Sequence, residues 1–158
     1  MVHTKQGRWV MYQKILVPLD GSARAEAILD HLSAWISSSE GELVLLLVVQ
    51  PPIVTSGFKT ISVDKSRTEA RRLAEDGQAY LGRVAQRLKE QGIKARGIVK
   101  VGAVVEIIME AAQGEEVDLI AMASHGRSGL SWVFYGSVAA GVLQQVDRPI
   151  LLIRSGDQ

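Results

Sequence analysis

The sequence predicts one α/β domain built around a doubly wound, five-stranded parallel sheet. Continuously apolar runs recur along the chain, as expected for strands that helices cover on both faces. Between these runs lie segments whose apolar residues repeat every three to four positions, which is typical of amphipathic helices. Alternating strands and helices imply right-handed crossovers and therefore parallel strands. We predict the strand order 3-2-1-4-5.

Five segments are predicted as strands. Residues 94–101 alternate between apolar and polar positions and suit the edge of the sheet. Residues 148–154 form the last strand, whose Pro149 fits a strand start or an edge. The continuously apolar segments are residues 14–19, 43–49 and 117–123.

Four segments between the strands are predicted as helices. The first follows Ser22, whose hydroxyl can cap it. The longest runs from about Thr68 to Gln91, and Gly92 ends it. The third follows Gly102, with Val104, Ile107, Ile108 and Ala111 facing inward, and the last begins near Gly136–Ser137.

Two segments fall outside this alternation. Residues 50–66 are long for a connection and rich in turn residues, a pattern typical of lids, subunit contacts or locally disordered loops. Residues 1–11 are a short basic leader without helical or strand periodicity. We predict that they form an N-terminal arm ahead of a single folded domain spanning residues 12–156.

Composition excludes several classes of function. A net charge of +1 and an aromatic content of 5% argue against a nucleic-acid-binding protein. The absence of cysteine excludes disulfides, thiolate zinc sites and cysteine nucleophiles, and it is compatible with a cytoplasmic location. No stretch approaches the roughly 20 apolar residues that cross a bilayer, so no membrane partner is expected.

The predicted strand order places a ligand site between the first and fourth strands. In open α/β sheets, ligands bind beyond the carboxyl ends of the strands where the order reverses. The loop at residues 123–137 leaves the fourth strand there, and its glycines end in Gly136–Ser137 at a helix start. Backbone amides and a helix N-terminus suit an anion. The patterns of a P-loop and of a dinucleotide fingerprint are both absent.

Three stretches carry a resemblance to a known family: "KILVPLDGS", "MASHGRSGLSWVFYGSV" and "RPILLIR". Over residues 12–154 the chain resembles the universal stress protein family, in its ATP-binding branch. That resemblance implies a Rossmann-like fold of the adenine-nucleotide alpha hydrolase-like type. The branch has Gly, two residues, Gly, nine residues and then Gly-Ser or Gly-Thr. Here Ala123 replaces the first glycine, and Gly126 and Gly136–Ser137 keep the spacing.

The resemblance implies an ATP site, with AMP or ADP as alternatives and Mg²⁺ as an accompanying ion. Asp20 would lie near the ribose or phosphates beside Pro18, and Val48 would present its backbone to adenine. Gly102 is a further candidate to approach the base, although the family's proline after the third strand is missing here. The contacts implied around the ribose and phosphates are Met122, Ala123, Gly126, Gly136, Ser137 and Val138.

Other interpretations of these residues remain open. Asp20 also suits a cap for the turn into the first helix. His125 fits a turn or ribose-side position better than a catalytic base, and Arg127 fits either a phosphate contact or a solvated loop tip. Ser124 and its neighbouring serines lack the G-x-S-x-G pattern of a nucleophile. No residues have the spacing of a metal site.

The function implied by the resemblance is a homodimeric, nucleotide-dependent stress-response regulator that binds ATP. The strand at residues 149–154 would pair across a two-fold axis, and its apolar run is costly as an exposed edge. One alternative is a nucleotide-free dimeric interaction module of the same family. The other is a slow ATP hydrolase, for which the sequence offers few groups beyond Asp20 and Arg127. No catalytic residue is assigned.

Overall fold

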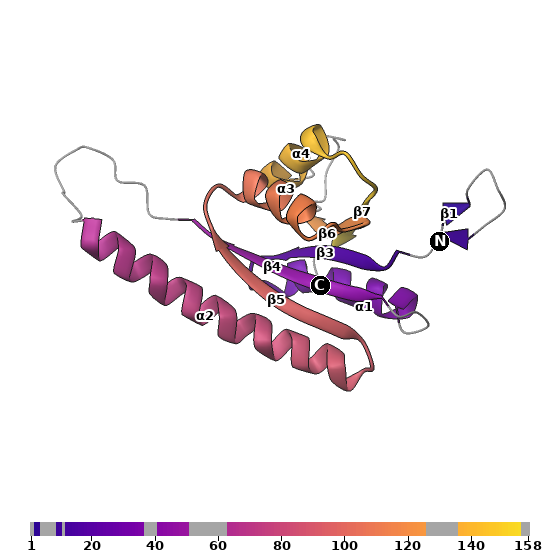
Figure 1. Cartoon of the computed structure of the whole chain (residues 1–158), viewed down its shortest axis with the longest axis horizontal. Coiled ribbons are helices and arrows are strands. Elements are labelled where there is room, and N and C mark those ends of the chain that lie inside the picture. Colours follow the sequence, from indigo (N-terminus) through magenta and orange to yellow (C-terminus); the bar gives the residue numbers. More distant parts are fainter. Residues whose placement is uncertain are drawn as a thin grey trace.

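A parallel sheet flanked by helices forms the body of the molecule (Figure 1). The structure is a computed structural model that describes residues 2–3, 9–10, 12–36, 41–50, 63–125 and 136–155. Within these residues the sheet has five strands in the order β5-β4-β3-β6-β7, which confirms the predicted order 3-2-1-4-5. Its strands are β3 (Lys14–Leu19), β4 (Glu42–Val49), β5 (Lys94–Val101), β6 (Leu119–His125) and β7 (Ile150–Ser155).

The predicted bounds agree for β3 and β5, and they differ most at β6. This strand begins at Leu119, two residues later than predicted, because the residues before it are used in turns. The Val117 amide donates to the Ala112 carbonyl at 3.1 Å. The Asp118 carboxylate accepts hydrogen bonds from the backbone amides of Gln13 and Lys14, at 2.9 and 2.8 Å. The apolar run therefore starts before the hydrogen-bonded strand does.

Four described helices connect the strands: α1 (Ala23–Ile36), α2 (Val63–Glu90), α3 (Val104–Gly114) and α4 (Gly136–Gln145). Ser22 caps α1 as predicted, because its Oγ accepts a hydrogen bond from the Ala25 amide at 3.1 Å. Gly92 ends α2 with a φ of +80°, a conformation that favours glycine. The helix starts five residues earlier than predicted, in the segment read as a connection. Of that connection, residues 51–62 lie outside the described part.

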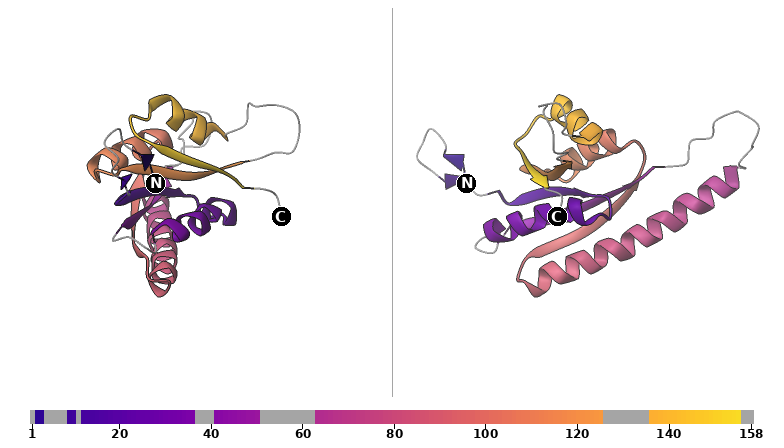
Figure 2. Two further views of the ribbon diagram at one scale, coloured as in Figure 1. Left: turned by 90° about the vertical axis from the view of Figure 1, so that its right-hand side faces the viewer. Right: turned by 180° about the vertical axis from the view of Figure 1, so that it is seen from behind.

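The helices cover the two faces of the sheet in pairs (Figure 2), α1 and α2 on one face and α3 and α4 on the other. Side chains therefore form two apolar clusters, and alternate residues of β3 belong to different clusters: Ile15 and Val17 face α1 and α2, whereas Leu16 faces α3 and α4. This two-sided burial explains the continuous apolar runs of the sequence.

The N-terminal residues contain a structure that the sequence did not predict. β1 (Val2–His3) pairs antiparallel with β2 (Trp9–Val10) in a separate two-stranded sheet. The predicted arm showed no strand periodicity because strands of two residues are too short to reveal one. The division between an arm and a domain beginning at Tyr12 stays a prediction.

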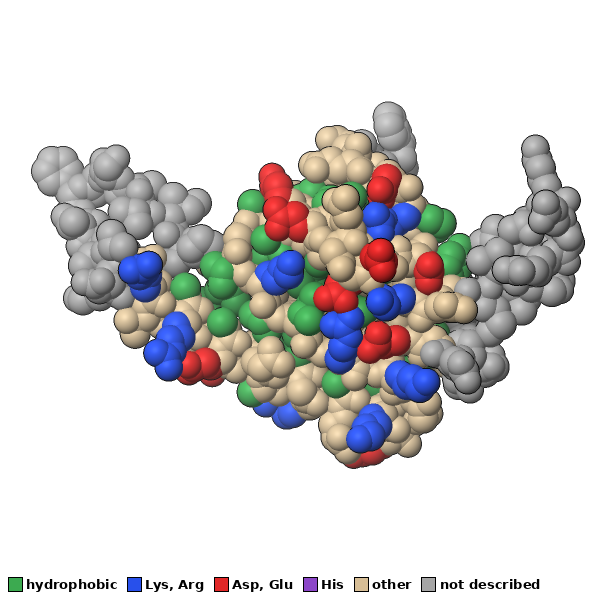
Figure 3. Space-filling view, viewed as in Figure 1, with side chains coloured by type: hydrophobic (Ala, Val, Ile, Leu, Met, Phe, Trp, Pro, Cys, Tyr) green, Lys and Arg blue, Asp and Glu red, His purple; other side chains and the backbone are tan. Residues whose placement is uncertain are grey.

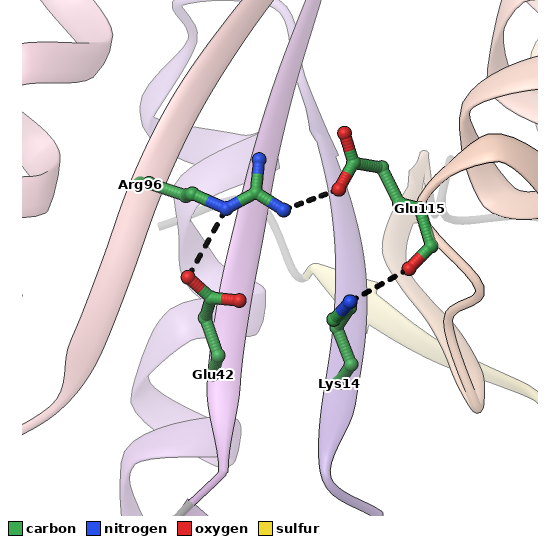
Figure 4. A network of polar contacts seen from close by, with 4 residues as sticks. All are labelled: Lys14, Glu42, Arg96 and Glu115. Carbon is green, nitrogen blue, oxygen red and sulfur yellow. Dashed lines mark hydrogen bonds and ion pairs between the residues drawn. The ribbon is translucent and has the colours of Figure 1, made fainter.

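A polar network crosses the sheet at the amino ends of its strands (Figure 4). Arg96 on β5 donates through Nε to the Glu42 carboxylate on β4 at 3.1 Å and through Nη2 to the carboxylate of Glu115. The Lys14 ammonium on β3 donates to the Glu115 carbonyl at 2.9 Å. The hydrogen bond from Arg96 holds the pKa of Glu115 below its ordinary value. The network joins the end of α3 to three strands.

Candidate functional site

The sheet opens between its first and fourth strands. β3 pairs with β4 along all six of its residues, but it pairs with β6 only through Ile15–Leu119 and Leu16–Ile120. Both strands continue beyond that point, β3 to Leu19 and β6 to His125. The hydrogen-bonded ladder thus stops halfway, at the position where the strand order reverses. A crevice at the carboxyl ends follows from this topology.

A cavity of about 510 Å³ occupies this crevice. Apart from the further candidate Gly102, its lining includes every predicted contact residue that lies in the described part of the chain. Gly126 and the loop of residues 126–135 lie outside that part. The structure therefore gathers residues from three strands and one helix, although their role in binding stays a prediction. The predicted residues that line the cavity are Pro18, Asp20, Val48, Met122, Ala123, Gly136, Ser137 and Val138.

One wall of the cavity is hydrocarbon. Leu46 and Val48 reach it from β4, Val104 and Ile108 from α3, and Met122 from β6. Leu46, Ile108 and Met122 are buried in the cluster beneath α3 and α4. Such a wall suits a flat, weakly polar group better than a charged one.

The sequence prediction did not assign several of the residues that line this cavity. Val104 and Ile108 were expected to face inward from their helix, and that periodicity was the signal that could have placed them at the site. The predicted candidate Gly102 does not line the cavity, and its amide donates to the Val49 carbonyl at 3.0 Å. The other lining residues that were not assigned are Leu19, Ala25, Leu46, Gln50 and Ala139.

Asp20 holds the turn into α1, as one of its two predicted roles requires, and it also lies at the cavity. Its Oδ1 accepts a hydrogen bond from the Ser22 amide at 2.9 Å, and Gly21 between them has a φ of +84°. This turn leads the chain from β3 into α1. The Asp20 side chain is also exposed at the cavity. Its turn hydrogen bond thus holds a carboxylate at the rim of the crevice.

The start of α4 forms another part of the cavity lining. Gly136 has a φ of +73°, where a side chain is strained, and Ser137 and Val138 follow it in the first turn. The amides of a first helical turn lack partners within their helix and lie at the positive end of its dipole. The cavity therefore has a hydrocarbon wall and, at the start of α4, a site suited to an anion.

Two other chemical possibilities receive no support from the described residues. The buried Ser124 hydroxyl donates to the Ile153 carbonyl at 3.2 Å, so it holds β7 and does not face the cavity as a nucleophile. No group of three or more His, Cys, Asp or Glu side chains in the described part could hold a metal ion. None of the helices described is long and apolar enough to cross a membrane.

The surface charges are mixed in sign. On the face shown in Figure 3, acidic and basic side chains lie among one another. Several charged side chains of the described surface form ion pairs, such as Arg71 with Glu75 on α2 at 2.9 Å. Among the described residues that line the cavity, Asp20 is the only acidic or basic one. Any phosphate bound there relies on helix amides and hydroxyls from these residues.

Comparisons with known proteins agree on one family. The model of the universal stress protein family matches residues 11–154. Universal stress protein MJ0577 of Methanocaldococcus jannaschii is 31% identical over 157 residues, covering 92% of this chain and 96% of that protein. Its solved structure has a TM-score of 0.78, covering 94% of this chain and all of that one.

Two further solved structures share the fold and contain ligands. A universal stress protein in complex with cAMP has a TM-score of 0.66 at 22% identity, covering 93% of this chain and 100% of that one. A family protein from Arabidopsis thaliana with AMP bound has a TM-score of 0.63 at 19% identity, covering 91% and 92%. At these identities the likeness establishes the fold alone.

Proposed function

This chain belongs to the universal stress protein family, and we propose that it binds an adenine nucleotide in the crevice between β3 and β6. One observation carries the proposal. The residues that the family pattern implies as contacts are scattered from Pro18 to Val138 in the sequence, and those described line a single cavity. ATP is the ligand we expect, with AMP and ADP as alternatives.

The cavity suits such a ligand in size and in polarity. Its volume of about 510 Å³ falls within the range of roughly 300–1,000 Å³ found for small-molecule sites. A base fits against the hydrocarbon of Val48 and Met122, and phosphates fit at the amides that follow Gly136. Asp20 would then face the ribose hydroxyls or a Mg²⁺ ion bound mostly by phosphate and water. The cAMP and AMP held by two proteins of the same fold support this ligand class.

We further propose that the protein is a cytoplasmic homodimer whose nucleotide occupancy regulates a stress response. The two edges of the sheet differ in character. The outer strand β5 carries Lys94, Arg96 and Lys100, charges that oppose pairing with another strand. The outer strand β7 begins with four consecutive half-buried apolar residues, 150–153. Pairing of β7 with a second copy would cover them, and analytical ultracentrifugation showing a monomer at micromolar concentration would contradict it.

Isothermal titration calorimetry tests the nucleotide site. We expect binding of ATP, strengthened by Mg²⁺, and a loss of about tenfold or more in affinity in Gly136→Val, because a β-branched side chain at positive φ displaces the amides at the start of α4. Gly92→Val is the matched control. It places the same side chain at a φ of +80° outside the cavity, and it should bind ATP normally.

The outcomes separate the alternatives. If the folded protein binds no adenine nucleotide at millimolar concentration, the proposed site is wrong and the nucleotide-free interaction module is favoured. If ATP binds and phosphate release exceeds the uncatalysed rate, the slow hydrolase is favoured over a purely regulatory role. If Gly136→Val and Gly92→Val bind ATP equally well, α4 does not form part of the site.

A further inference from the structure

Three alternate residues of β4 and of the position just after it line the cavity. Leu46 and Val48 are followed, just beyond the end of the strand, by Gln50. Residues at every second position of an extended chain share a face, which explains why all three line the same cavity. The first two are hydrocarbon, whereas Gln50 is exposed and ends in a carboxamide. The β4 wall thus becomes polar at its open end.

Gln50 is the polar side chain on the hydrocarbon side of the cavity. Among the described lining residues, the polar side chains are Asp20, Gln50 and Ser137. Asp20 follows β3 and already accepts the Ser22 amide, and Ser137 lies in the first turn of α4. In the described part of the chain, the Gln50 side chain makes no hydrogen bond of its own. Its donor and acceptor are therefore available to a ligand that lies against Val48.

We propose that Gln50 is a specificity-determining residue that recognises the N6 and N7 edge of adenine. The inference rests on the proposed nucleotide site. A carboxamide presents a donor beside an acceptor, and adenine presents the complementary pair, an N7 acceptor beside an N6 amino donor. Guanine presents two acceptors, N7 and O6, on the same edge, so one of the two hydrogen bonds is lost. The carboxamide thereby favours adenine over guanine.

The test compares ATP, GTP and 7-deaza-ATP, in which a carbon replaces N7. The unmodified protein should bind ATP about tenfold or more tightly than GTP, and about fivefold more tightly than 7-deaza-ATP. Gln50→Leu has a similar volume and no hydrogen-bonding group. It removes both hydrogen bonds to ATP and only the N6 bond to 7-deaza-ATP. It should therefore weaken the binding of ATP about fivefold more than the binding of 7-deaza-ATP, so that the preference for ATP disappears.

Gln50→Glu gives a second readout that a loss of folding cannot imitate. A carboxylate still accepts from N6 but repels the N7 lone pair, so this variant should prefer 7-deaza-ATP to ATP. Gln113→Leu, on an exposed position of α3 outside the cavity, is the control and should bind like the unmodified protein.

Unchanged ratios among the three nucleotides in both Gln50 variants would overturn the inference and leave the nucleotide site standing. A failure of the unmodified protein to bind any adenine nucleotide would instead overturn both the proposed site and this inference.

Discussion

The contact between α3 and α4 depends on Gly141 having no side chain. A Cβ added at Gly141 would lie 2.7 Å from Cγ2 of Val105 and 3.4 Å from its Cγ1. Valine in a helix has one strongly preferred rotamer, so its methyl groups cannot turn away and the helices must separate. Such overpacking costs about 1–3 kcal/mol. Alanine favours a helix interior over glycine by about 1 kcal/mol, which leaves Gly141→Ala destabilising by up to about 2 kcal/mol.

The sign of this effect should reverse when Val105 is shortened. Val105→Ala removes both γ-carbons and leaves only the valine Cβ, 3.6 Å from the added Cβ, which is an ordinary contact. In that background, Gly141→Ala should stabilise the protein by about 0.5–1 kcal/mol, because only the helix preference remains. Gly82→Ala is the control. Gly82 is exposed on α2 with nothing within 4 Å of an added Cβ. The Gly82→Ala substitution should therefore stabilise the protein in both backgrounds.

Urea unfolding followed by circular dichroism measures the free energy of unfolding for this cycle. The reasoning is refuted if Gly141→Ala has the same sign in both backgrounds, or if Gly82→Ala destabilises the protein. Because α3 and α4 both line the cavity, Gly141→Ala should also weaken ATP binding, and Val105→Ala should restore it in the double variant.

Two further predictions concern polar contacts away from the cavity. The pKa of Glu115 is lowered from its ordinary value of 4.5, so the pairing with Arg96 stabilises the protein at pH values above 4.5. This stabilisation is lost as the pH falls through the lowered pKa of Glu115. Glu115→Gln should therefore lower the free energy of unfolding by about 1 kcal/mol at neutral pH. The value is small because the Arg96 side chain is 40% exposed. In acid, the urea midpoints of this variant and of the unmodified protein should converge. Tyr80→Phe removes the 2.8 Å hydrogen bond to Glu26 that joins α2 to α1. It should cost about 0.5–1.5 kcal/mol in the same assay, and an unchanged midpoint would show that this bond adds nothing.

The strand order and the place of the cavity could be predicted because both follow from long-range regularities. Burial on two faces gives continuous apolar runs, and alternation with helices gives a parallel sheet whose order reverses beside β3. The start of α2 at Val63 was harder to predict from the sequence. At Gly77 the helix lies against Leu47 and Val99, whereas Leu73 nearer its start is 37% exposed. Local ion pairs such as Arg72 with Glu69 accompany this part of the helix, and the sequence prediction did not use them.

The cavity wall was predicted only in part, for a different reason. A family pattern identifies positions by spacing, and it therefore found Asp20 and Gly136–Ser137. Gln50 has no motif, and its exposed amide resembles any loop residue in the sequence. Only the alternation of β4 past its last hydrogen-bonded residue brings Gln50 to the cavity. Contacts that depend on the direction of one side chain require the folded structure.

Because the crevice separates the carboxyl ends of β3 and β6, contacts at the amino ends must hold these two strands together. The described ladder pairs between β3 and β6 are Ile15–Leu119 and Leu16–Ile120. The two strands are therefore held together near their amino ends. There Asp118 accepts the Lys14 amide at 2.8 Å and donates its own amide to the Lys14 carbonyl at 2.8 Å. Arg148 donates to the carbonyls of Ala112 and Val117, which fixes the chain entering β6. Removing the Asp118 carboxylate should therefore loosen the crevice as well as the sheet, because no ladder pairs nearer the cavity would keep β6 in register with β3.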